Sequence, residues 1–156
     1  MFGKLASTTA HWVQHVVTTL FLVMVLVGLL QIVNRYLPVP SMSWTEELQR
    51  YLHIWLVFLA IPLAYRHRRH ICVKLFSRLE QGRLGAGLET CTHALWLVLA
   101  LALVVLGGKL VAVGQHQYSA GLGVKMAWIY LCQISGGMVL MLFALQNLID
   151  PEGGES

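Results

Sequence analysis

The residues of this chain that are best suited to chemistry lie close together, between Trp44 and Trp55. Within this segment, two acidic side chains, Glu46 and Glu47, are followed four and three residues later by Arg50. On a helix, such spacing allows an ion pair between neighbouring turns. The segment therefore supports charge pairing within a helix or the binding of a neighbouring subunit.

Purely structural roles also suit this segment. Ser43 and Glu46 fit a capping box, in which each side chain satisfies a free backbone N–H group, and Thr45 is a competing N-cap. Glu46 and Glu47 also suit the positive end of a helix. Arg50 is harder to explain, because a cation about one turn inside a membrane span is expensive unless it is paired or reaches the interface. Two hypotheses follow: capping and anchoring at the membrane boundary, or an interface with another subunit.

Four long apolar stretches must position this segment. Hydrophobic residues make up 57% of the 156 residues and charged residues only 12%, against roughly 25% charged in soluble domains. A helix needs about 20 mostly apolar residues to cross a bilayer core. The sequence therefore predicts an all-α integral membrane protein, a single four-span domain over residues 1–156, with spans at about 12–34, 48–66, 89–112 and 127–149.

The distribution of lysine and arginine predicts the orientation of these spans. One side of the membrane would carry both termini, the loop at 66–88 and seven cations: Lys4, Arg66, Arg68, Arg69, Lys74, Arg78 and Arg83. The other side would carry four: Arg35, Arg50, Lys109 and Lys125. The positive-inside rule places the side with seven in the cytosol. Since the cations follow the topology, the positive net charge is not evidence for nucleic-acid binding.

The loop between the second and third spans has a pattern of its own at about 72–81. Apolar residues recur there at helical spacing, with cations on another face, which predicts an amphipathic helix too short to span. We expect this helix to lie on the cytosolic leaflet, with its cations facing anionic headgroups. A cytosolic helix packed on the protein or a partner is the alternative. The membrane-surface residues on this hypothesis are Arg68, Arg69, Lys74, Leu75, Phe76 and Arg78.

The central parts of the predicted spans contain no aspartate or glutamate. Ion-coupled carriers usually need such a residue, so the chain is a poor candidate for carrying a solute alone. Histidines near the cytosolic ends of the first three spans leave a four-helix haem protein open, because neutral imidazole is a good axial ligand. A Soret band would reveal the haem protein, and uptake by the chain alone would reveal a self-sufficient small transporter.

Several motifs occur in a characteristic order along the chain. They are Asn34-Arg35-Tyr36, Trp44-Thr45-Glu46-Glu47-Leu48, Arg50-Tyr51, Ile54-Trp55, Phe58, His70-Ile71 with Val73, and then Ser119, Leu122, Trp128 and Tyr130. With them, the chain from about Trp12 to Leu148 resembles the small membrane subunit (DctQ-type) of tripartite ATP-independent periplasmic (TRAP) transporters. Three residues depart from the pattern: Ala60 replaces a frequent glycine, Lys74 a common acidic residue, and Lys125 a frequent proline.

The resemblance implies a non-catalytic scaffold in the bacterial inner membrane. In this family a large membrane subunit carries sodium and substrate by an elevator motion, and a periplasmic binding protein delivers an organic acid. The small subunit braces the large one and helps to dock the binding protein, so no cofactor is expected on this chain. The expected partners are the large subunit, the binding protein and membrane lipid. The expected partner-interface residues are Arg35, Trp44, Glu46, Glu47, Arg50, Tyr51 and Trp55.

Overall fold

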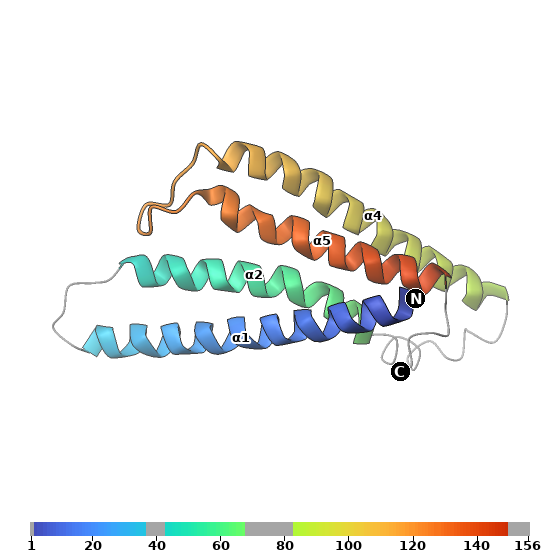
Figure 1. The fold of residues 1–156 in the computed structure, drawn as a ribbon, viewed down its shortest axis with the longest axis horizontal. Coiled ribbons are helices and arrows are strands. Elements are labelled where there is room, and N and C mark those ends of the chain that lie inside the picture. The colour runs from blue at the N-terminus through green and yellow to red at the C-terminus, as the bar shows by residue number, and fades with distance from the viewer. Residues whose placement is uncertain (1, 37–42, 68–82, 150–156) are drawn as a thin grey trace.

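The computed structural model describes residues 2–36, 43–67 and 83–149, and all of its long elements are helices (Figure 1). They are α1 (Phe2–Tyr36), α2 (Ser43–His67), α4 (Arg83–Gly114) and α5 (Met126–Ile149). Each contains a stretch long and apolar enough to cross a membrane. Helices suit a bilayer because they satisfy their own backbone hydrogen bonds where no water is available. The prediction of an all-α protein with four candidate spans is therefore confirmed for the described residues.

The candidate spans differ from the predicted ones mainly at their starts. The first runs over Ala6–Tyr36 and the second over Trp44–Arg66, six and four residues earlier than expected. The uncharged run that begins at Leu5 lets α1 start early. The acidic first turn of α2 is accommodated because carboxylates suit the positive end of a helix. The short helix predicted at about 72–81, with its membrane-surface residues, lies outside the described residues.

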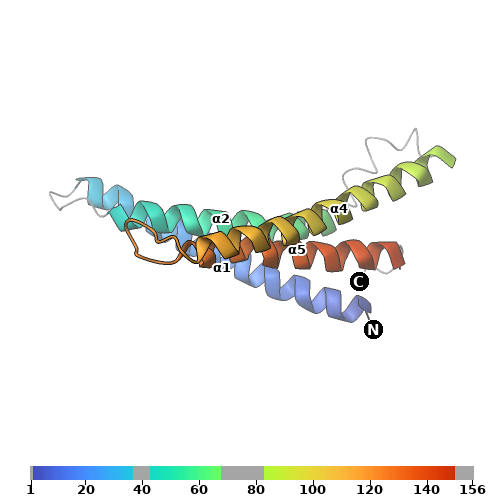
Figure 2. The same cartoon turned by 90° about the horizontal axis from the view of Figure 1, so that it is seen from above.

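The four helices form a row in the order α4, α5, α2, α1, and each packs on its neighbours in that row (Figure 1). No backbone contact joins α1 to α4 within the described ranges. Viewed from above, the starts of α1 and α4 leave the row on opposite sides of α5 (Figure 2). Following the predicted topology, we call the end with the α1–α2 and α4–α5 connections the outer end, and the opposite one the inner end.

Helix α1 contacts α2 along one narrow seam. Its less exposed residues recur at alternating steps of three and four: Ala10, Val13, Val17, Leu20, Met24, Val27, Gln31 and Asn34. This heptad spacing is typical of helices packed side by side at a small crossing angle. Off the seam, large apolar side chains such as Leu26, 64% exposed, are uncovered. Most of the surface of α1 is therefore left for lipid or for another protein.

Helix α5 is packed on both sides because two adjacent glycines let its neighbours approach. A Cβ atom at Gly136 would overlap the carbonyl oxygen of Phe58 in α2, and one at Gly137 would lie 3.0 Å from Val104 in α4. Pro62 has no N–H group to bond the Phe58 carbonyl four residues earlier. The carbonyl that Pro62 leaves without its helical donor is therefore the one that meets Gly136, whose Cα hydrogen points toward it.

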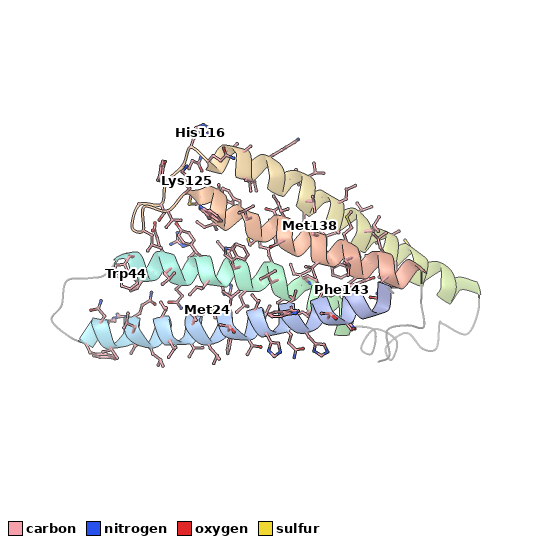
Figure 3. All side chains as sticks on the ribbon, in the orientation of Figure 1. Met24, Trp44, His116, Lys125, Met138 and Phe143 are labelled. Carbon is pink, nitrogen blue, oxygen red and sulfur yellow. The ribbon has the colours of Figure 1, made fainter. Side chains whose placement is uncertain are left out.

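The best-buried side chains gather toward the inner half of the row. The cluster consists of Ala6, Tyr65, Ala100, Leu140, Phe143 and Ala144, contributed by all four helices. Figure 3 shows Phe143, which is only 2% exposed, near the inner end of α5. The hydrophobic core of the described chain therefore lies in its inner half.

Candidate functional site

The predicted interface segment occupies the outer end of α2, where Trp44 lies in the first turn (Figure 3). Thr45 is buried, at 2% exposure, whereas Trp44 and Glu46 are exposed. The side chain of Ser43 lies outside the described part, so the predicted capping box stays a prediction. The neighbouring acids Glu46 and Glu47 point to different flanks of α2, and this separation organises the whole site.

Glu47 faces α5 and binds the α4–α5 connection. Its Oε2 atom accepts hydrogen bonds from the Ser119 hydroxyl and from the backbone N–H groups of Gly121 and Leu122, the latter two at 2.9 Å. Hydrogen bonds to a charged carboxylate are roughly twice as strong as neutral ones. The carboxylate therefore ties the start of α2 to a loop more than seventy residues further along the chain.

The loop that Glu47 binds is folded by its own backbone. Ser119 donates its N–H to the Val124 carbonyl at 2.9 Å, and Gly123 donates to the Ser119 carbonyl at 3.1 Å. Gly123 has a φ of 64°, a conformation that favours glycine. A Cβ at Gly121 would lie 2.9 Å from the Glu47 carboxylate, so glycine there allows the carboxylate to approach. The loop thus presents its N–H groups as a preformed anion-binding turn.

The opposite flank of α2 forms an open groove with α1. The groove has a volume of about 550 Å³ and is lined by Met24 and Gln31 of α1 and by Glu46, Gln49, Arg50 and His53 of α2. Figure 3 shows Met24 on α1. Glu46, Arg50 and His53 are all exposed. This groove, which we call the α1–α2 groove, combines one anion, one cation, two amides and an imidazole at the outer end of the row.

Arg50 forms no ion pair with Glu46 or Glu47 in the part of the chain that the structure describes. The intrahelical pair allowed by the sequence is therefore not formed, because Glu47 is turned toward α5 and Glu46 stays exposed. Arg50 lies among groove residues without an acidic partner from its own helix.

The other predicted interface residues are distributed around the same end. The hydroxyl of Tyr51 lies 3.6 Å from the sulfur of Met126 at the start of α5, and Tyr51 is half-buried. Trp55 is half-buried as well, while Arg35 is exposed in the last turn of α1. The structure thus places Glu47 and Tyr51 on the α5 side and Glu46 and Arg50 on the α1 side. It does not bring the seven into one cluster.

A second set of polar contacts lies at the inner end. Arg66 of α2 donates a hydrogen bond of 2.7 Å to the Ala6 carbonyl of α1, and its guanidinium stands 5.5 Å from the ring centre of Phe143. The Tyr65 hydroxyl is hydrogen bonded to Nδ1 of His93 at 2.7 Å. These contacts link all four helices at the inner end, and they engage His93, one of the histidines near the inner ends of the first three spans.

No group of three His, Cys, Asp or Glu side chains that could hold a metal ion occurs among the described residues. His67 and His70, the other histidines near the second span's inner end, have side chains outside the described part. The polar side-chain contacts described above join helices to one another or to the α4–α5 loop.

Sequence reasoning missed two features of the outer end. The spacing of Glu46, Gln49, Arg50 and His53 is i, i+3, i+4, i+7, which is one helical face, so this polar stripe was visible in the sequence. The hydrogen bonds between Glu47 and the α4–α5 loop correspond to no sequence pattern. Ser119 and Leu122 stand out in the sequence only as motif residues. No local pattern predicts a contact between the start of α2 and a loop more than seventy residues later.

Comparison with known proteins identifies one family. The model of the family described as "Tripartite ATP-independent periplasmic transporters, DctQ component" matches residues 24–152. The matched region includes the last third of α1 and all of α2, α4 and α5. No curated protein matches the chain.

Proposed function

Because the chain belongs to the DctQ family of TRAP transporter components, we propose that it is the non-catalytic scaffold subunit of its transporter. A DctQ component is a multi-pass membrane subunit of a transporter and not an enzyme. The proposal adds that residues 1–156 form one four-span domain that braces a large membrane subunit. That subunit would carry sodium and an organic acid, and a periplasmic protein would deliver the acid.

The distribution of acidic residues is the observation that carries this proposal. Within the four spans of the described chain, acidic side chains occur only at Glu46 and Glu47, both at the start of α2. Coupling an ion to movement across the membrane usually needs an ionisable group deeper in the span. Glu47 is also already engaged by Ser119, Gly121 and Leu122. A chain with this distribution is suited to holding a carrier and not to being one.

The shape of the chain supports the same function. Four helices in a row offer wide faces and leave α1 and α4, at the two edges, with many exposed apolar side chains. Monomeric soluble proteins rarely expose such surfaces; in a membrane they suit lipid or a second protein. The outer loop, held by Glu47, is a fixed surface on which a periplasmic partner can dock. In the proposal, the predicted interface residues at this end also contact partner proteins.

Reconstitution tests the scaffold function. Proteoliposomes that contain this chain alone should show no sodium-driven uptake of organic acids. Vesicles that contain the chain with its large membrane component, together with the binding protein, should show uptake. Robust uptake by the chain alone would refute the proposal, as would full activity of the large component without this chain.

Orientation in the membrane is a separate part of the proposal, with both termini in the cytosol. In a background without native cysteines, Lys125→Cys in the exposed outer loop should react with a membrane-impermeant thiol reagent added to the periplasmic side. Gly82→Cys should react only after the membrane is opened. The reverse pattern would invert the topology without affecting family membership.

A further inference from the structure

We propose that the α1–α2 groove is the docking site for a transmembrane helix of the large TRAP membrane component, and that this helix places a carboxylate opposite Arg50. The inference rests on the proposed function, since it names the surface and the chemistry by which the scaffold holds its partner. Three features of the molecule support the inference: the depth of the groove, its unbalanced charge and the apolar surface of α1 beside it.

The depth of the groove favours a protein helix over a lipid headgroup. The α2 span, Trp44–Arg66, has 23 residues, or about 34 Å at 1.5 Å per residue, so it slightly exceeds a hydrocarbon core of about 30 Å. Arg50 and His53 then lie roughly 7 Å and 11 Å below the outer edge of that core. A lipid phosphate stays outside the core, where only the longer Arg50 side chain can reach it, whereas a neighbouring helix reaches both residues.

The charges of the groove define what the helix must carry. Arg50 is exposed at a depth where a cation needs a partner, and the described chain provides no ion pair for it. Glu46 lies one turn nearer the outer surface, where water can solvate its carboxylate. The stronger requirement is therefore for an anion at the level of Arg50, and a carboxylate can accept two parallel hydrogen bonds from a guanidinium.

The surroundings of the groove are those of a helix-packing site. Gln31 lies on the seam of α1, and the large side chains next to it in sequence that lie off the seam are apolar. They are Leu29, Leu30, Ile32 and Val33, which are between 47% and 56% exposed. Amides such as Gln31 and Gln49 hydrogen bond across helices in membranes. Polar groups in the groove, beside a largely apolar exposed surface of α1, suit a helix that is mostly apolar and carries a few polar groups.

Photo-crosslinking within the intact complex tests the location. A photo-reactive residue at His53→p-benzoylphenylalanine should form an adduct with the large component. The matched control is Leu106→p-benzoylphenylalanine, because Leu106 is exposed on α4 at a similar depth, on the opposite edge of the row. It should give no such adduct. An adduct from position 106 alone, or only a lipid adduct from position 53, would overturn the groove as the docking site.

Charge reversal tests the chemistry. Arg50→Glu should lower co-purification of the large component in mild detergent by about tenfold or more, because two acids would then face each other at a desolvated site. Lys109→Glu, which reverses another exposed cation near the outer end of α4, should leave recovery unchanged. An acid-to-lysine change in the large component should rescue Arg50→Glu. Wild-type recovery with Arg50→Glu would refute the pairing.

Three controls keep the results interpretable. Each variant chain should elute alone as a single species, and Arg50→Gln provides a milder change if charge reversal prevents folding. Arg50→Gln should reduce co-purification in the same direction, and unchanged recovery would count against the pairing. If the wild-type chain itself recovers no large component, the scaffold function fails. That result differs from a loss confined to the Arg50 variants, which supports the groove.

Discussion

The two flanks of α2 at its outer end are built from neighbouring residues but differ in how their polar groups are satisfied. On the α5 side, Glu47 binds Ser119, Gly121 and Leu122. On the α1 side, Glu46 and Arg50 are exposed in a groove. The carboxylate of the first flank is bound within the chain, whereas Arg50 on the second flank has no ion pair among the described residues. On the proposed function, the first flank holds the protein together and the second is left for a partner.

The largest effect is expected where α2 and α5 are closest. Gly136→Ala would place a Cβ against the Phe58 carbonyl oxygen, a backbone atom that can move only with the helix. We expect the free energy of unfolding of the purified chain in detergent to fall by about 1–3 kcal/mol, the usual range for overpacking.

Gly108→Ala is the matched control for this change, since nothing lies within 4 Å of a Cβ at that position. The same substitution there should be neutral or slightly stabilising, because alanine is the better helix former. Gly108 and Ala112 are both exposed, and Gly107 makes the contact with α5. Equal effects of the two alanine substitutions would argue against a tight α2–α5 contact.

The next largest effect concerns the two acids. Glu47→Gln keeps an acceptor oxygen but removes the charge that strengthens its three hydrogen bonds. We expect a loss of about 1–2 kcal/mol at the loop, seen as roughly tenfold faster amide hydrogen exchange at Gly121 and Leu122. Glu46→Gln, one residue earlier, should leave both amides unchanged. Equal exchange in the two variants would mean that Glu47 does not hold the loop.

A smaller effect is expected at the inner end. Tyr65→Phe removes the hydroxyl that is hydrogen bonded to His93 Nδ1 and keeps the ring packed on Trp96, whose centroid is 5.0 Å away. Hydrogen bonds between membrane helices contribute about 0.6 kcal/mol on average, so the midpoint of thermal unfolding should fall by only a few degrees. Tyr65→Ala, which also removes the ring, should cost several times more.

The smallest effect is expected at Arg50 in the isolated chain. Since Arg50 has no ion pair within the described residues, Arg50→Ala should change the stability of the chain by less than about 0.5 kcal/mol. Measured unfolding of the purified subunit checks this value. A large loss of stability in the isolated chain would mean that Arg50 has its partner within this chain. The α1–α2 groove would then be satisfied internally, as the Glu47 flank is.

The sequence predicted much of the fold and less of the site. Four spans followed from apolar length, and their family from motifs such as Trp44-Thr45-Glu46-Glu47-Leu48, which the family match over residues 24–152 confirms. The row of helices did not follow, because faces that contact lipid and faces that contact a neighbouring helix are both largely apolar, and hydropathy cannot distinguish them. The heptad spacing of the α1 seam can be recognised only from the burial of its residues, because most residues on and off the seam are apolar.

The outer end shows which features follow from the sequence and which depend on the tertiary structure. The sequence alone determined that acids and an arginine stand at the start of a membrane span, because residue type, length and charge suffice for that. Adjacent residues on a helix point about 100° apart, so Glu46 and Glu47 had to face different neighbours. Which neighbour each one meets was decided only by the order α4, α5, α2, α1, which brings the loop at Ser119 to Glu47 and leaves Arg50 beside the groove.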